Sequence, residues 1–183
     1  MTELEQAATG LEGHYRDVLR GPDGRVIWDR GWKKNTIVGD CRILLASFMR
    51  GNPSTTGVIG LQVGAGLAAW YLSGPPAGTP GQVALVDPFP ATVPPANIQL
   101  DFLNGGAVVL TPTSRIQVRA TFGPSVPPGV PPWPDANHPT ANLREFGLVA
   151  TLGGTTVLVN YVTHPVIALD PASTLERTIW LQF

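Results

Sequence analysis

Cysteine, charge and long apolar runs are all scarce in this chain of 183 residues. The single cysteine, Cys41, excludes a disulfide within the chain and a metal site built from several cysteines. Only 14% of the residues are charged, against about 25% in an average soluble domain. No apolar run reaches the roughly 18 residues that a membrane-spanning helix needs, so we expect no membrane insertion. The low charge indicates either a surface that lies largely against other protein or one rich in uncharged polar groups.

The few charges nearly cancel, and the formal net charge is −1. Because no overall field attracts phosphate groups, we expect no nucleic acid as a partner. Residues 1–13 are acidic and lack the basic and apolar parts of a signal peptide. We therefore expect synthesis in a reducing cytoplasm.

Patterns that carry catalysis are also missing. The histidines, His14, His138 and His164, are far apart in the sequence, and no G-x-S-x-G motif is present. Asp135 and His138 could share a loop and a metal ion, but their segment (DANHP) is also typical of an ordinary turn. Further carboxylates are available, but the sequence does not pair them across a cleft: Asp87, Asp101, Glu145 and Asp170. We therefore predict that the protein is not an enzyme and holds no metal and no cofactor.

One glycine-containing motif resembles a nucleotide-binding site in its sequence pattern alone. Residues 63–69 (VGAGLAA) fit the G-x-G-x-x-A fingerprint, and a short apolar run precedes them. That fingerprint needs a helix whose N-terminus faces the pyrophosphate, inside a βαβ unit. The helix possible at 67–73 ends at Gly74-Pro75 after barely two turns. We therefore interpret these glycines as a strand exit.

The most informative pattern present is apolar/polar alternation in the second half of the chain. A period of two predicts strands with one buried and one solvated face, which is typical of antiparallel sheets. It recurs at 96–102, 115–122, 157–161 and 175–183. In the last segment Trp180 lies on the face opposite Ile179 and Leu181, so we expect it against the helix or a neighbouring subunit.

Turn signals define further strands. Gly21-Pro22-Asp23-Gly24 predicts a hairpin between 14–20 and 25–31, with Trp28 and Trp32 in the core. Glycine pairs predict two more hairpins, and a short apolar run predicts a buried strand: 97–103 with 107–110, 142–150 with 156–163, and 58–63. A short extended piece is expected at 83–86.

A single helix is predicted after residue 36. Its apolar residues recur at helical spacing and are expected to pack on the sheet: Ile37, Cys41, Leu44, Leu45 and Phe48. Asn35 or Thr36 suits the N-cap, and Gly51 suits the left-handed closing position. Cys41 falls in the stripe, which predicts a core residue rather than a reactive thiol.

Together these elements predict a mainly-β fold, an antiparallel β-sandwich of about eight strands with one α-helix packed on it. We expect an N-terminal tail at 1–13 and a single domain at 14–183. Two proline-rich loops interrupt the strands, at 73–95 and 123–139.

Aromatic and proline residues in or beside these loops are the candidate site. Trp70 and Tyr71 stand beside the first loop, and Pro131, Pro132 and Trp133 lie in the second. We predict that they form a partner interface, because proline-flanked aromatics anchor protein contacts. Two alternatives stay open: the rings seal the loops onto their own domain, or they stack on sugar rings.

Three segments together resemble bacteriophage tail and virion structural proteins. They are WKKNTIV at 32–38 running into the helix at 39–49, IGLQVGAG at 59–66, and LREFGL at 143–148. A glycine-centred hairpin, Pro165-Val166 and a closing strand follow in the order found in that family. The family pattern is not followed at Gln62, at Leu67 or in the long proline-rich loop at 123–139.

The resemblance implies a non-enzymatic building block of a tail, baseplate, fibre or capsid decoration, or of a phage-derived contractile injection particle. Its partners would be copies of itself and other particle proteins. The implied location is a virion or phage-like particle that is assembled in the bacterial cytoplasm. The alternative is a carbohydrate-binding module that recognises a host-surface glycan through Trp70 or Trp133.

Overall fold

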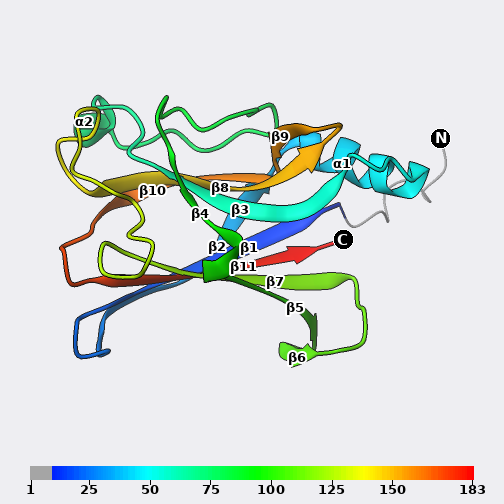
Figure 1. Cartoon of the computed structure of the whole chain (residues 1–183), viewed down its shortest axis with the longest axis horizontal. Coiled ribbons are helices and arrows are strands. Elements are labelled where there is room, and N and C mark those ends of the chain that lie inside the picture. The colour runs from blue at the N-terminus through cyan, green and yellow to red at the C-terminus, as the bar shows by residue number, and fades with distance from the viewer. Residues whose placement is uncertain (1–9) are drawn as a thin grey trace.

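Two antiparallel layers of strands face each other in the computed structural model, which describes residues 10–183 (Figure 1). The first layer contains β1 (Glu12–Arg20), β2 (Val26–Ile37), β5 (Ile98–Asn104), β6 (Ala107–Val109), β7 (Arg115–Phe122) and β11 (Thr174–Gln182). The second layer contains β3 (Thr56–Gly64), β4 (Ala91–Val93), β8 (Asn142–Leu152), β9 (Thr155–Leu158) and β10 (Asn160–Ala168). The prediction of a mainly-β antiparallel sandwich with a helix packed on it is confirmed.

The two layers are continuous with each other through hydrogen bonds. The strand order is β4-β3-β8-β10-β2-β1-β11-β7-β5-β6, with β9 paired to β8. The step from one layer to the other is the β10–β2 pair, which has only two residue partners, Asn160 with Ile37 and Tyr161 with Thr36. The described residues form eleven strands, ten along this path and β9 beside it, rather than about eight. One reason is that the segment predicted at 156–163 divides near Val159 into β9 and β10.

The first hairpin forms as predicted but starts earlier. β1 pairs antiparallel with β2, and the Gly24 amide donates to the Gly21 carbonyl across the turn at 3.0 Å. β1 begins at Glu12, so the end of the predicted tail belongs to the sheet. The tail residues 1–9 lie outside the described part. The piece expected at 83–86 is not a strand.

The helix α1 (Gly39–Arg50) lies against β8 and β9. Cys41 and Leu44 are buried, as predicted, and burial raises the pKa of the Cys41 thiol to about 11. Gly51 adopts the left-handed closing conformation. The predicted caps are wrong because β2 continues to Ile37, so Val38 is the N-cap and no side chain caps the helix. Phe48 is 43% exposed rather than packed on the sheet.

The main core lies between the two layers and draws residues from both. β8 is the central strand of the second layer and is buried on both faces, from Leu143 to Ala150. Its outer face carries a smaller apolar cluster made by Val38, Leu85, Val149, Leu158 and Tyr161. The loop that contains Leu85 therefore covers the sheet. The strands that end the path, β4 and β6, have three residues each, which leaves little edge for another strand to pair with.

A short helix, α2 (Trp70–Ser73), and a 3-10 turn, η2 (Pro95–Asn97), complete the described fold. α2 lies at the end of the molecule opposite α1 (Figure 1). None of the helices in the described range 10–183 is both long and apolar enough to cross a bilayer.

Candidate functional site

The predicted interface residues do not share one surface. Trp70 and Trp133 are only 7% and 6% exposed, and Pro131 is buried with them. Tyr71 is 75% exposed, and Pro132 is also exposed. The alternative that the rings seal the loops onto their own domain therefore describes Trp70 and Trp133. Trp133 belongs to the main core.

Trp133 holds a buried histidine in place. Its ring stacks on that of His138 with the centroids 3.8 Å apart. His138 Nδ1 lies 3.0 Å from an Asp135 oxygen, and Nε2 lies 3.0 Å from an Asp87 oxygen. Asp135 and His138 thus meet as the sequence suggested, with Asp87 as an additional partner. Among residues 10–183, no group of three His, Cys, Asp or Glu side chains has the geometry of a metal site.

Asp87 joins three separate segments. It accepts hydrogen bonds from the amides of Ala65 at 2.7 Å and Phe89 at 2.9 Å, besides its contact with His138. Asp87 is held in turn by Glu145 of β8, which is fully buried. Glu145 accepts a hydrogen bond from the Asp87 amide at 2.6 Å and another from the Tyr161 hydroxyl at 2.6 Å. Burial raises the pKa of Tyr161, and the hydrogen bond to Glu145 raises it further. The hydroxyl therefore stays protonated and remains a hydrogen-bond donor.

These contacts form the base of a hollow beside α2, here called the α2 hollow. It measures about 700 Å³ and its lining includes Asp87, His138 and Arg144 at the base. Arg144 is 8% exposed and donates to the Ala65 carbonyl at 3.0 Å. The lining also includes exposed apolar residues: Tyr71, Leu72 and Phe89. The hollow thus combines a polar, hydrogen-bonded base with an apolar wall.

The glycines of the nucleotide-like motif have a packing role here. A Cβ on Gly66, whose φ is +65°, would lie 2.3 Å from the Trp70 ring. A Cβ on Gly64 would lie 2.6 Å from a Glu145 oxygen. Only glycine fits such close approaches, so the motif lets Trp70 and Glu145 reach the backbone at the exit of β3. This agrees with the strand-exit interpretation.

A second buried polar cluster lies within the main core, between the layers. Arg177 of β11 and Asp17 of β1 are both fully buried, and two hydrogen bonds of 2.7 and 2.8 Å join them. Arg177 Nη2 also lies 3.2 Å from His164 Nε2, and the guanidinium carbon is 3.7 Å from the Phe146 ring centroid. Burial raises the pKa of Asp17, but the charge and hydrogen bonds of Arg177 outweigh it, and the net direction is down.

The tautomer of His164 follows from its neighbours. Nδ1 lies 2.9 Å from the Pro165 carbonyl and must carry the proton, which leaves Nε2 free to accept from Arg177. Burial, followed by the positive charge of Arg177, lowers the pKa of His164 to about 3. The ring is therefore neutral at physiological pH.

Sequence reasoning missed this cluster, although a signal was present. Arg177 is two residues away from both Leu175 and Ile179, so it lies on the same inward face of β11. In the same way, Asp17 lies between the inward residues Tyr15 and Leu19 of β1. A charged residue at an inward position of an alternating strand predicts a buried partner. Opposite charges on two such strands could have been paired on that ground.

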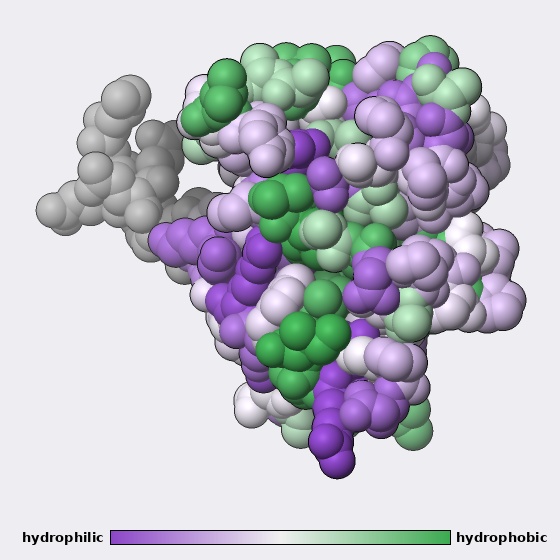
Figure 2. Space-filling view, turned by 90° about the vertical axis from the view of Figure 1, so that its left-hand side faces the viewer, coloured by the Kyte–Doolittle hydropathy of each residue, from purple (hydrophilic) through white to green (hydrophobic). Residues whose placement is uncertain are grey.

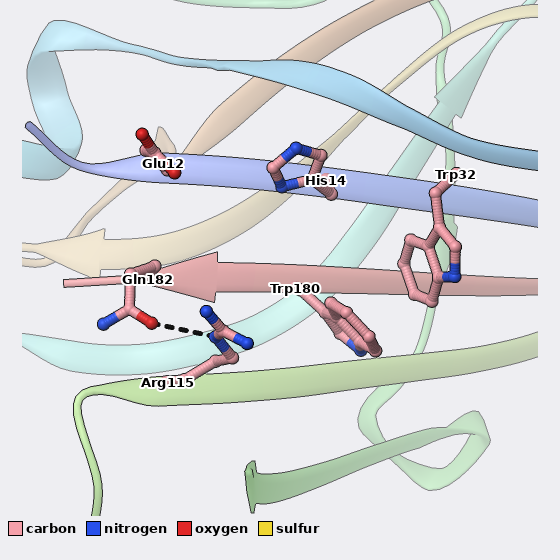
Figure 3. Close-up of a pocket in the computed structure, with 6 residues that line it drawn as sticks. All are labelled: Glu12, His14, Trp32, Arg115, Trp180 and Gln182. Atoms are coloured by element: carbon pink, nitrogen blue, oxygen red, sulfur yellow. Dashed lines mark hydrogen bonds between the residues drawn. The ribbon is translucent and has the colours of Figure 1, made fainter. Parts of the chain in front are cut away.

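A third site lies on the outer face of the first layer and is here called the tryptophan pocket. It measures about 200 Å³ and is lined by Glu12, His14, Trp32, Arg115, Trp180 and Gln182. Figure 3 shows the two indoles at one end and Glu12, Gln182 and Arg115 at the other, with His14 between them. Trp32 was expected in the core but is 40% exposed. Trp28 does pack against the core as predicted.

The two indoles support each other in this pocket. Their centroids are 4.0 Å apart with the planes tilted by 34°, and Trp180 Nε1 donates to Gln117 Oε1 at 3.0 Å. Trp180 therefore packs against Trp32, a residue of its own chain, rather than against the helix.

No protein family, curated protein or solved structure matches this chain in comparisons with known proteins.

Proposed function

We propose that this protein is a non-enzymatic structural subunit whose copies associate through the apolar side of the α2 hollow. The observation that carries the proposal is the exposure of neighbouring apolar side chains there. Tyr71 is 75%, Leu72 is 92% and Phe89 is 56% exposed, and all three line one hollow. Contiguous apolar surface of this kind marks interaction sites in soluble proteins.

The composition of the chain supports the same proposal. A charged fraction of 14% leaves few groups to keep the surface solvated, and charged residues are depleted at the centre of interfaces. Figure 2 shows apolar groups in several patches on the side that includes α2, one of them near the top, the level of α2 in Figure 1. Because β4 and β6 are short, association by strand pairing is disfavoured, which leaves contacts between side chains.

The resemblance to phage structural proteins suggests where such a subunit works. We propose a component of a virion or phage-like particle (tail, baseplate, fibre or capsid decoration), assembled in the bacterial cytoplasm with other particle proteins. Electron microscopy of particles that carry this chain with a tag tests the proposal. Density for the tag at repeated positions supports it, and a tagged chain that does not sediment with particles contradicts it.

Association is tested by analytical ultracentrifugation of the purified chain. We expect the wild type to form oligomers and Leu72→Glu to be monomeric, because the new carboxylate would be buried without a partner. The matched control is Leu110→Glu. Leu110 is 99% exposed in the loop after β6, away from α2, so this variant should associate like the wild type. A monomeric wild type at about 100 µM, or equal loss in both variants, would overturn the proposal.

A further inference from the structure

We infer that the tryptophan pocket is a binding site for a neutral saccharide, separate from the surface of the proposed assembly. Six residues from four strands of one chain build it, so it is complete without a partner. Its volume of about 200 Å³ suits one sugar ring with its neighbours projecting into solvent. No part of it lies in the loops at 73–95 or 123–139.

The apolar half of the pocket suits the face of a pyranose ring. Trp32 is 40% exposed, and its ring packs against that of Trp180, which also lines the pocket. The face of an indole carries negative charge density and attracts the slightly positive C–H groups that line one side of a sugar ring. In Figure 3 Trp180 lies between Trp32 and Arg115, so a sugar ring placed against the paired indoles would extend from them toward His14 and Arg115.

The polar half supplies donors and acceptors of hydrogen bonds. Arg115 Nε donates to Gln182 Oε1 at 2.8 Å, which fixes the guanidinium and leaves other N–H groups for a ligand. The Gln182 amide nitrogen is itself held by Ser114, at 2.8 Å from its hydroxyl. Glu12 is exposed at the rim and offers carboxylate oxygens. Sugar hydroxyls both donate and accept, so this mixed set suits them.

The charges in the pocket favour an uncharged ligand. The guanidinium carbon of Arg115 lies 5.9 Å from the Trp180 ring centroid, where it opposes a quaternary ammonium ligand that would otherwise suit two indoles. Glu12, at the end of the pocket away from the indoles, opposes an anion there. A neutral polyhydroxylated ring avoids both costs and still uses both groups as hydrogen-bond partners.

The backbone that carries the pocket is held by strand pairing before any ligand arrives. Its residues lie on paired strands, with His14 directly opposite Trp180 and Glu12 opposite Gln182 in the β1–β11 register. Trp180 is held in addition by Gln117. Side chains already fixed in place lose little entropy on binding.

The test is a panel of neutral oligosaccharides built from hexoses and N-acetylhexosamines, first on an array and then by titration calorimetry of the best probe. We expect one or more probes to bind, and Trp32→Ala to weaken binding about tenfold or more. Arg115→Ala serves as a second variant, because it removes hydrogen-bond donors but keeps both indole rings, and it should weaken binding as well.

The matched control is Phe48→Ala, which removes an aromatic ring that is 43% exposed on α1, outside both the pocket and the α2 hollow, and should leave saccharide affinity unchanged. The inference is overturned if no neutral probe binds at about 10 mM, if binding survives both pocket variants, or if Phe48→Ala removes it instead. Oligomer formation by the wild type is measured separately, so failure here is distinct from failure of the assembly proposal.

Discussion

At the scale of the residue, the buried pair of Asp17 and Arg177 is the least expected feature of the chain. Both side chains are fully buried, where an unpaired charge is costly and a well-bonded pair is tolerated. The exposed pair of Arg16 and Asp29 offers a comparison on neighbouring strands, with side chains 42% and 31% exposed. Solvent screens such a pair, so it contributes little.

We expect Arg177→Met to lower the free energy of unfolding by about 3–5 kcal/mol, because it leaves Asp17 charged and unpaired in the core. The double variant Asp17→Leu/Arg177→Met should lose much less than the two single variants combined. Urea denaturation measures all three. Arg16→Met is the control and should cost no more than about 1 kcal/mol. Equal losses at the buried and exposed pairs would contradict this account.

His164 makes stability depend on pH. Its pKa in the folded chain is about 3, below the roughly 6.5 expected when unfolded, so the unfolded chain binds the proton more readily. The associated stability is fully present above pH 6.5 and is lost as pH falls toward 3, by up to about 1.4 kcal/mol per pH unit.

Chemical denaturation at a series of pH values between 7 and 4 checks this expectation. The variant His164→Gln does not titrate in that window and should show a flatter profile than the wild type. Asp17, whose pKa is lowered in the fold, adds to the loss only where carboxylates titrate, at the acid end. Parallel profiles for wild type and variant would show that His164 does not cause the loss.

At the scale of the element, the long proline-rich loop at 123–139 is part of the core rather than a free arm. Val130 and Trp133 belong to the main apolar cluster, and the stacked His138 links the loop to Asp87. The loop therefore shapes the base of the α2 hollow. Proline-rich composition alone does not distinguish a loop folded onto its domain from one that reaches a neighbour.

We expect Trp133→Ala to lower the free energy of unfolding by about 3–5 kcal/mol, because it removes a large buried ring and leaves a cavity. Pro132→Ala, at the exposed neighbouring position, should change stability by about 1 kcal/mol at most. Thermal and urea unfolding measure the stability of the two variants and of the wild type. Two variants of equal stability would show that the Trp133 ring contributes little to the core.

At the scale of the whole molecule, the low net charge predicts which kind of contact would hold the proposed oligomers together. A formal net charge of −1 gives little repulsion and little steering. Association through Tyr71, Leu72 and Phe89 would be hydrophobic, and ions screen charge but do not weaken apolar contacts.

We therefore expect the oligomers to persist when sodium chloride rises from about 0.1 to about 1 M, and to become more stable in ammonium sulfate, which strengthens apolar burial. Sedimentation at each salt concentration measures this. Leu72→Glu is the control and should stay monomeric in sodium chloride throughout. Oligomers that dissociate as sodium chloride rises would indicate contacts between charges instead.

Much of the fold was predictable because its signals are local. Alternation in β7 and β11, the turn at Gly21–Gly24 and the helical spacing around Cys41 each depend on residues close in sequence. Strand breaks were not predictable in this way. The separation of β9 from β10 near Val159 depends on a crossing between two layers, which no short window of sequence contains.

The sites needed information that only three dimensions hold. The sequence by itself determined the buried faces of β7 and β11, the core position of Cys41 and the scarcity of charge, since composition and periodicity record these directly. Only the tertiary structure decided that Trp133 is buried, that Trp32 is exposed beside Trp180, and that Arg177 reaches Asp17. Burial of a side chain depends on what packs over it, and here the covering residues lie far away along the chain.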